Sequence, residues 1–524
     1  MDAGEELVYL HLTCSQLPSH LRGSAIQISV HALKSDGQSI EIGDTEVLYN
    51  DSTDLLFQRS IQIVVRFDLH QQLRFDLHMM TNENIPNVIG SVSAGLRSVV
   101  NAPSEILLPL EPSGDPLHWD LDESPLLGVE AVPPESSKNG TILQFHAHNL
   151  HADGIANLAP YFTVSLMHNS IKKFPTLLYR SEVPTADTNS PIWKEFIIPT
   201  KFLSLSSQTL IEIACYSFRN NHTEDIFLGK FPVTFMQLLN GTITKFMLHV
   251  SGRKKRENTY FELIKFDRIP SVPTFVSAVR SGMKLHFTIA VDFATNNGSP
   301  HDPDSLHYMH PNIYSHYYKA LADIASCVCP YDAQRRVSLV GFGAKVPPQW
   351  EFSQYFPLNG VDKNNPYVRG VPEILSAYRR AAMSVHPFAP TNYADTIHKI
   401  IKMAKTAVEK RTDMYFVLII LTNGYLQRAP EVADTVDQIV EASELPISIC
   451  FAGIQNEKHK VGKGDHSRLT RLVDPTMKSS KNRPLTRQCV SYVDYEEEQD
   501  KSSVRELLSL IPMQVSQYLL SSFH

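Results

Sequence analysis

The chain has 524 residues, of which 43% are hydrophobic and 20% are charged. This length and balance predict a globular protein of roughly three or four domains. The formal net charge of −7 argues against a general nucleic-acid-binding protein, so we expect no nucleic acid among the partners. The six cysteines lack the spacing of a disulfide framework or of a zinc knuckle.

The N-terminal sequence MDAGEELVYL has neither a basic segment nor a long apolar run. We therefore expect no secretory signal peptide. No stretch approaches the about 18 consecutive apolar residues of a membrane-spanning helix. These features predict a cytoplasmic protein that is not secreted and has no transmembrane segment.

The first half of the chain has the pattern of two β domains. Residues 1–122 contain short alternating runs such as AIQISVHAL and LRFDLHMM, which are typical of an antiparallel sandwich. A stretch of low hydrophobicity follows and predicts a linker over 123–140. The same strand pattern returns over 141–267, which predicts a second all-β antiparallel sandwich.

The two β domains also share the order and spacing of their motifs. Glu46 and Gly90 are 44 positions apart in the first domain, and Glu182 and Gly229 are 47 positions apart in the second. Similar runs flank these residues in both copies. The sequence therefore predicts a tandem repeat of one β domain.

After residue 268 strands alternate with helical patterns, which predicts an α/β doubly wound, Rossmann-like domain over 268–524. Apolar strands are expected at LHFTIAVDF, RVSLVGFGA, FVLIILTNG and LPISICFAGI. Helices are expected over 313–326, 372–384, 392–410 and 430–443, with one proline-kinked helix over 501–521.

Polar residues end two of these strands and begin one loop. Asp292 ends the first strand, Asn423 follows the third, and Thr391 lies in a loop. Ligands bind beyond the carboxyl ends of strands in parallel sheets, so we expect these points to converge. Together with Asn296 they resemble the metal site of a von Willebrand type A domain, and this resemblance makes all four residues candidate Mg²⁺ ligands. Only Asp292 is a carboxylate. Two interpretations stay open: a former site that is kept as structure, or a working site that binds Mg²⁺ weakly.

In this resemblance to a von Willebrand type A domain, Ala294, Asn296 and Asn423 replace the usual Ser, Ser and Asp. The segment NSPIWKEF, residues 189–196, resembles the signature of C2 domains. Two C2 domains before a type A domain resemble the architecture of the copine family. The α/β part is also similar to copines in its motifs, namely LHY at 306–308, GFGAK at 341–345, FPLN at 356–359, NPY at 365–367, PTNY at 390–393 and the Ile511–Pro512, Gln514, Tyr518 pattern.

The copine resemblance implies Ca²⁺-triggered binding to phospholipid through Asp residues on the C2 loops. Five positions where the family carries Asp hold other residues here, namely Met79, Asn87, Ala159, Ser217 and Arg219. Asp153 and Asp225 remain as remnants of the calcium loops in the second domain. Because Ca²⁺ takes 6–8 oxygen ligands, and its affinity follows their charge, we expect no functional calcium site.

Basic residues offer a second way to bind membranes. Arg253, Lys254, Lys255 and Arg256 lie in a predicted turn, and Lys172 and Lys173 lie in an earlier strand or turn. Each cationic residue near an anionic leaflet contributes about 1 kcal/mol, so this cluster is a candidate membrane-binding surface. The alternative interpretation is an ordinary solvated turn.

We therefore interpret the chain as a non-enzymatic, copine-like adaptor. It would associate with anionic phospholipid membranes and recruit protein partners through its type A domain, with its calcium ligands largely lost. Two alternatives are a conventional calcium-dependent copine and a soluble scaffold without lipid binding. An enzyme at the sheet edge is disfavoured because no nucleotide-binding motif is present.

Overall fold

The computed structural model describes residues 4–522 apart from the segments 19–20, 22–23, 35–36, 50–54, 58, 82–84, 103, 114–124, 135–139, 153–157, 168–175, 185–187, 200–209, 220–224, 240–243, 251–258, 270–272, 333, 361–364, 425–428, 456–468, 470 and 496–501. The chain forms two compact units. One unit contains residues 4–137 and 274–283, and the other contains 1–3, 138–273 and 284–524.

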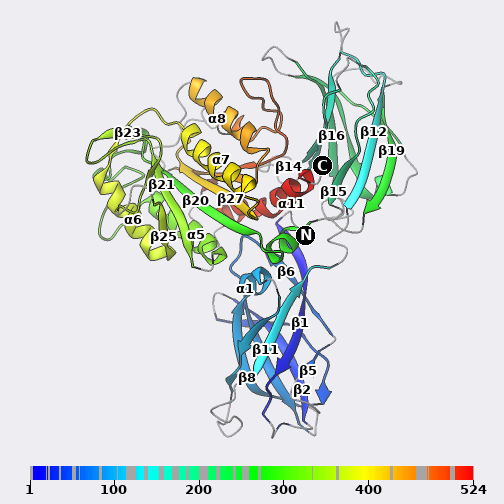
Figure 1. The fold of residues 1–524 in the computed structure, drawn as a ribbon, viewed down its shortest axis with the longest axis vertical. Coiled ribbons are helices and arrows are strands. Elements are labelled where there is room, and N and C mark those ends of the chain that lie inside the picture. Colours follow the sequence, from blue (N-terminus) through cyan, green and yellow to red (C-terminus); the bar gives the residue numbers. More distant parts are fainter. Residues whose placement is uncertain are drawn as a thin grey trace. The chain divides into compact units, whose positions relative to one another are not determined.

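The first unit is an antiparallel sandwich, called here the first sandwich (Figure 1). One sheet has the order β5-β1-β11-β9 with β6 on β1, and the other has β10-β8-β7-β2-β3 with β4 on β2. Side chains of β1 alternate between core and surface, as expected for a strand with one buried face. The elements are β1 (Glu5–Ser15), β2 (Ala25–Leu33), β3 (Ser39–Asp44), β4 (Leu48–Tyr49), β5 (Leu55–Leu56), β6 (Ile61–Arg66), β7 (Gln72–Met80), β8 (Pro86–Gly95), α1 (Leu96–Asn101), β9 (Ile106–Pro109), β10 (Glu111–Pro112), β11 (Leu126–Val132) and α4 (Phe275–Arg280).

The predicted linker over 123–140 is wrong where β11 forms. This strand pairs with β1 on one side and with β9 on the other, and Leu127, Val129 and Ala131 are buried. Its seven residues alternate, but the polar and proline-containing residues on both sides mask that pattern in a wide window. Without β11, β1 would present unpaired main-chain groups along its length.

The predicted start of the third domain at residue 268 is also wrong, because α4 packs with the first sandwich. The ring of Phe275 meets the ring of Phe67 edge-on, with centroids 5.2 Å apart. Arg280 donates to the carboxylate of Glu130 and to the main-chain oxygen of Ala131. The N-terminus of α4 meets the buried Glu6 carboxylate, which accepts from the amides of Phe275 at 3.2 Å and Val276 at 3.1 Å.

The second unit begins with another antiparallel sandwich, the second sandwich. Its sheets have the orders β15-β12-β19-β18 and β14-β13-β16-β17. The aromatic rings of Phe145, Phe162, Trp193 and Phe261 contact one another in its core. The elements are β12 (Gly140–His148), β13 (Pro160–Leu166), β14 (Thr176–Arg180), β15 (Phe196–Pro199), β16 (Leu210–Ser217), β17 (Ile226–Thr234), α3 (Phe235–Leu239), β18 (Lys245–Met247) and β19 (Tyr260–Ile269).

One repeated set of hydrogen bonds supports the predicted duplication. In the first sandwich the Thr45 hydroxyl accepts from the amide of Ile28 and donates to the main-chain oxygen of Glu46. In the second, the Ser181 hydroxyl accepts from the amide of Phe162 and donates to the oxygen of Glu182. The two glutamates also match, since Glu46 accepts from the amide of Arg59 and Glu182 from the amide of Lys194.

The rest of the second unit is an α/β domain built on a sheet of order β24-β21-β20-β27-β28-β29, with β25 also on β21. Neighbouring strands from β21 to β29 in that order are parallel, whereas β24 and β25 run antiparallel to β21. Both faces of β27 are buried, as expected when helices cover a parallel sheet on both sides. The main elements are β20 (Lys284–Asp292), η4 (Thr295–Asn297), α5 (His316–Val328), η5 (Cys329–Tyr331), β21 (Arg336–Phe342), β24 (Phe356–Pro357), β25 (Tyr367–Arg369), α6 (Gly370–Ser384), α7 (Ala394–Glu409), β27 (Met414–Thr422), α8 (Ala429–Ala442), β28 (Ile447–Ile454), β29 (Val490–Tyr495), α10 (Ser502–Ser509) and α11 (Ile511–Ser521).

Two features of this domain differ from the sequence prediction. Strand β29 was not predicted, although it pairs with β28 over six residues. The expected kinked helix over 501–521 is instead two helices, α10 and α11, which are separated at Leu510. Pro512 lies in the first turn of α11, where its missing N–H is not needed for an intrahelical hydrogen bond. Met513 of α11 belongs to the core of the second sandwich, and Gln517 donates to the oxygen of Leu178. Helix α11 of the α/β domain therefore packs against the core of the second sandwich.

We expect Glu6→Ala to release the start of α4. Two hydrogen bonds to a charged acceptor would be lost, and each bond of this kind contributes about 1.5–3 kcal/mol. A local loss of about 3 kcal/mol corresponds to about 150-fold faster amide exchange at Val276. Hydrogen-exchange mass spectrometry of peptides covering 274–283 measures it. Glu5→Ala, on the other face of β1, is the matched control, and equal exchange in the two variants would contradict the cap.

Candidate functional site

The carboxyl end of β20 places Asp292 at the centre of a buried network of polar groups. Its Oδ1 accepts from the amide of Ala294 at 2.9 Å, and its Oδ2 accepts from the hydroxyl of Thr422 at 2.7 Å. The Tyr393 hydroxyl in turn lies 2.8 Å from the Thr422 hydroxyl. Thr422 ends the neighbouring strand β27, so the two strand ends meet as the parallel sheet requires.

The two asparagines that replace expected metal ligands bond to each other. Asn296 donates its side-chain amide to Asn423 Oδ1 at 2.8 Å, and Asn423 donates back to the main-chain oxygen of Asn296 at 3.1 Å. Thr391 is buried in the loop before α7. Within the described residues its hydroxyl forms no hydrogen bond with Asp292, Asn296 or Asn423. Three of the four candidate ligands thus form hydrogen bonds with other protein groups, and the hydroxyl beside Asp292 is that of Thr422.

The electrostatic environment of Asp292 disfavours a bare charge. Burial raises the pKa of its carboxyl to about 6, although the bonds from Thr422 and Ala294 act in the opposite direction. Beneath it His307 lies fully enclosed, with Nε2 2.8 Å from the main-chain oxygen of Asp292 and Nδ1 2.8 Å from the Tyr378 hydroxyl. Burial lowers the pKa of His307 to about 4, so it is neutral at pH 7. The residues offer Mg²⁺ one carboxylate with a raised pKa and otherwise only neutral oxygens, a poor match to the ion's preference for charged ligands.

The loop end of the second sandwich contains the remnant carboxylate Asp225. Its Oδ1 accepts from the amide of Arg219 at 2.9 Å, and its Oδ2 accepts from the Tyr161 hydroxyl at 2.9 Å. Ser217, at another position where an Asp was expected, accepts from the amide of Ala159 at 3.1 Å. Asp153 lies outside the described residues.

A cation from the α/β domain meets Asp225. The Lys478 ammonium forms an ion pair with Asp225 Oδ1; the Asp225 side chain is buried, and that of Lys478 is 11% exposed. Lys478 also donates to the main-chain oxygen of Arg219 at 3.2 Å and lies 4.0 Å from the centre of the Phe218 ring. Burial lowers the pKa of Lys478, and the Asp225 carboxylate acts in the opposite direction. Sequence analysis missed Lys478 because no local motif links it to a loop some 250 residues away.

The other predicted positions fall in two groups. Met79 and Asn87 face each other across β7 and β8 of the first sandwich. All the candidate membrane-binding residues, Lys172, Lys173, Arg253, Lys254, Lys255 and Arg256, lie outside the described residues.

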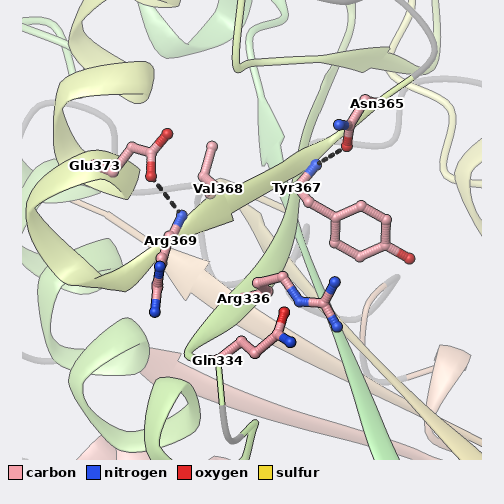
Figure 2. Close-up of a pocket in the computed structure, with 7 residues that line it drawn as sticks. All are labelled: Gln334, Arg336, Asn365, Tyr367, Val368, Arg369 and Glu373. Atoms are coloured by element: carbon pink, nitrogen blue, oxygen red, sulfur yellow. Dashed lines mark hydrogen bonds between the residues drawn. The ribbon is translucent and has the colours of Figure 1, made fainter.

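A shallow depression lies at the opposite end of the sheet from Asp292 (Figure 2). Its volume is about 300 Å³, and its lining is Gln334, Arg336, Asn365, Tyr367, Val368, Arg369 and Glu373. Two of its polar side chains are used locally, since Asn365 accepts from the amide of Tyr367 and Glu373 from the amide of Arg369. The depression is open and contains no arrangement of a nucleophile with a base.

Comparison with known proteins identifies the α/β domain. Residues 305–523 match the family model described as Copine. This is a copine-like protein. The antiparallel sheets before that region fit C2-like sandwiches, and the match supports a membrane- or lipid-associated role in a family that is generally non-enzymatic. None of the described helices is long and apolar enough to cross a bilayer.

Three solved structures illustrate the likeness. The domain "BON1-C2B" is 21% identical and matches 26% of this chain and 94% of its own, with a TM-score of 0.22. A structure of Extended-Synaptotagmin 2 that contains its SMP domain and two C2 domains is 16% identical over 51% of this chain and 57% of its own, with a TM-score of 0.20. Manganese-loaded TRAP protein of Plasmodium vivax is 12% identical over 44% of this chain and 74% of its own, with a TM-score of 0.27. All three TM-scores are low, so the copine-like assignment rests on the family match.

We expect Lys478→Met to destabilise the second sandwich by about 3 kcal/mol, because it leaves a buried carboxylate without its cation. Adding Asp225→Asn should recover most of that loss, which a double-mutant cycle measures. Trp193 is a buried probe of this sandwich in a background with Trp119→Phe and Trp350→Phe. Urea unfolding followed by its fluorescence gives the free energies. Lys481→Met, at an exposed position, is the control. Equal losses in the single and double variants would contradict the ion pair.

We expect Asn423→Asp to raise the affinity for Mg²⁺ by about tenfold or more, because it adds a second carboxylate next to Asp292. Adding Ala294→Ser should raise it further. Titration calorimetry on the full chain measures the change, and the full chain is needed because Met513 packs in the second sandwich. Asn312→Asp introduces the same charge at an exposed position and should have no effect. Tight Mg²⁺ binding before any substitution, or no gain in the double variant, would refute this account.

Proposed function

We propose that this protein is a copine-like adaptor that associates with anionic phospholipid membranes without needing Ca²⁺ and recruits protein partners through its α/β domain. It would work as a peripheral cytoplasmic protein at plasma or internal membranes. The observation that carries the proposal is the ion pair between Lys478 and Asp225.

The ion pair bears directly on calcium. A C2-type site needs several carboxylates on one set of loops, because Ca²⁺ must exchange its water for 6–8 oxygen ligands. Among the described loop residues of the second sandwich, the carboxylate of Asp225 is already neutralised by a lysine and bonded to Tyr161 and Arg219. A divalent ion would have to displace an ammonium group, and Ser217, at a second position where an Asp was expected, offers it only a neutral hydroxyl. This supports a second sandwich in which the Lys478 ammonium, and not Ca²⁺, pairs with the Asp225 carboxylate of the loops.

The first sandwich supports the same conclusion. Met79 and Asn87, which face each other at the start of its loop, bring a thioether and an amide where the copine resemblance implies carboxylates. Neither side chain carries charge. Attraction of a membrane would then fall to basic residues, of which Arg253 to Arg256 are the densest group in the sequence. Four cations at about 1 kcal/mol each give weak binding that salt can reverse.

An exposed aromatic patch supports a protein-binding role for the α/β domain. It lies on the small sheet β23-β22-β26, formed by Glu351–Ser353, Ala344–Val346 and His386–Pro387. Trp350, Phe352 and Phe388 are all exposed there, with the Phe352 and Phe388 rings 5.2 Å apart. Lys345 lies 4.4 Å from the Phe388 ring. Clustered aromatic side chains with a cationic neighbour are typical of protein interfaces. The resemblance of the sheet edge at Asp292 to a type A domain points to the same role.

Liposome co-sedimentation tests the proposal. We expect the full chain to pellet with phosphatidylserine-containing liposomes to the same extent in Ca²⁺ and in chelator, and less as salt rises. Replacing Arg253, Lys254, Lys255 and Arg256 together by Gln should abolish pelleting. The double variant Phe352→Ser, Phe388→Ser is the matched control, since it should keep lipid binding and lose captured proteins in cross-linking experiments.

Other outcomes separate the alternatives. A large increase of the bound fraction in Ca²⁺ would overturn the proposal in favour of a conventional calcium-dependent copine. No pelleting under any condition would indicate a scaffold without lipid contact. Unchanged pelleting of the Gln variant would show that the basic turn is only solvated.

A further inference from the structure

We propose that His146, His148 and Glu262 form a binding site for a Zn²⁺-like transition-metal ion on the outer face of the second sandwich. The site is independent of the calcium loops and of Asp292. It lies in the sheet that contains the adjacent strands β12 and β19 (Figure 1).

Strand register brings the three residues together. His146 and His148 are two residues apart in β12, so their side chains leave the same face of the sheet. Glu262 lies directly opposite His146 in β19, and its side chain therefore shares that face. The three form a triangle on two paired strands, a rigid scaffold that fixes the ligands without a loop.

The distances suit a single small ion. The three ligand atoms all lie within 4.8 Å of one another, and His148 Nε2 is 2.8 Å from Glu262 Oε2. Tetrahedral Zn²⁺, at about 2.0–2.2 Å from nitrogen and oxygen ligands, holds its ligand atoms about 3.3–3.6 Å apart. This value lies between the 2.8 Å separation of His148 from Glu262 and the 4.8 Å within which all three atoms fall, so small side-chain rotations would close the site around an ion.

Neighbouring groups hold the imidazoles in place. The His146 ring has a backbone hydrogen-bond partner in Ser190, and backbone partners are common for metal-bound histidine. The ring of Tyr260 stacks on His148 with centroids 4.5 Å apart. Lys245, opposite Glu262 on β18, lies 5.0 Å from the centre of the Tyr260 ring.

The ligand set selects the class of metal. Two imidazoles and one carboxylate suit Zn²⁺, Co²⁺ or Ni²⁺, whereas Ca²⁺ and Mg²⁺ prefer oxygen ligands alone. His148 and Glu262 are 23% and 31% exposed, so an ion can enter from solvent and keep a water as its fourth ligand. A plain ion pair between His148 and Glu262 would not account for the convergence of His146 on the same point.

The first sandwich contains a contrasting cluster. His31 Nε2 lies 3.3 Å from Asp76 Oδ2, and the Ser29 hydroxyl bridges His31 and His78. Arg74, however, donates two hydrogen bonds to the same Asp76 oxygen, at 2.8 and 3.1 Å. The guanidinium takes the place that a metal would need, so this cluster serves as an internal control.

Metal titration of the full chain tests the site. We expect one equivalent of Zn²⁺ to bind, with an affinity that falls at least about 100-fold in His148→Gln and in Glu262→Gln. Even residues that only hydrogen-bond the metal ligands typically change metal affinity by about 10- to 100-fold when they are replaced. His31→Gln should bind like the parent chain. Co²⁺ should give the strong visible absorption of a four-coordinate ion in the parent chain and in His31→Gln only.

Circular dichroism and Trp193 fluorescence verify that each variant is folded before its affinity is compared. Zn²⁺ binding of equal strength in the parent chain, His148→Gln and Glu262→Gln would overturn the proposal. Weak, six-coordinate Co²⁺ absorption in the parent chain would overturn it as well. Neither result would bear on membrane binding, which is measured without added transition metal.

Discussion

A carboxylate that leaves water must be met by donors or by a cation, and this constraint shapes each of the sites described above. Glu6 meets the first two amides of α4, Asp292 meets Thr422 and Ala294, and Asp225 meets Lys478, Tyr161 and Arg219. In each case the carboxylate joins two segments that are distant in sequence. The buried acids therefore act as connectors that fix how secondary structure elements meet.

The two sandwiches share a fold and differ in how their charges are balanced. Both keep the same bonds around Thr45 and Ser181 and the same role for Glu46 and Glu182. These bonds fix the backbone at equivalent places of the two sandwiches, whereas the side chains at the loop ends differ. At the loop ends the first sandwich has uncharged Met79 and Asn87, whereas the second keeps Asp225 and supplies its cation from the α/β domain. The loop end of the second sandwich is thus joined to the α/β domain by an intramolecular contact.

The contact between Lys478 and Asp225 relates the proposed function to the architecture of the second unit. Met513 packs into the core of the second sandwich while Lys478 contacts its loop end, so the α/β domain touches this sandwich at more than one place. Under the proposed function, loops that form this interface do not serve as a Ca²⁺ switch for membrane binding. Under the proposed function, the basic residues 253–256 would bind lipid, and the exposed rings of Phe352 and Phe388 would bind protein partners.

The sequence by itself determined the features that depend on local period. Alternating runs predicted the sandwich strands. The similar spacings from Glu46 to Gly90 and from Glu182 to Gly229 predicted the duplication. The apolar strands that end in Asp292 and in Thr422–Asn423 placed these residues at one sheet edge. Only the tertiary structure decided which groups meet across long separations. Strand β11 was hidden because its alternation is short and its flanks are polar, and α4 joined the first sandwich because Glu6, some 270 residues earlier, caps it. Lys478 with Asp225, and His146 and His148 with Glu262, depend on strand register and domain packing, which no local pattern encodes.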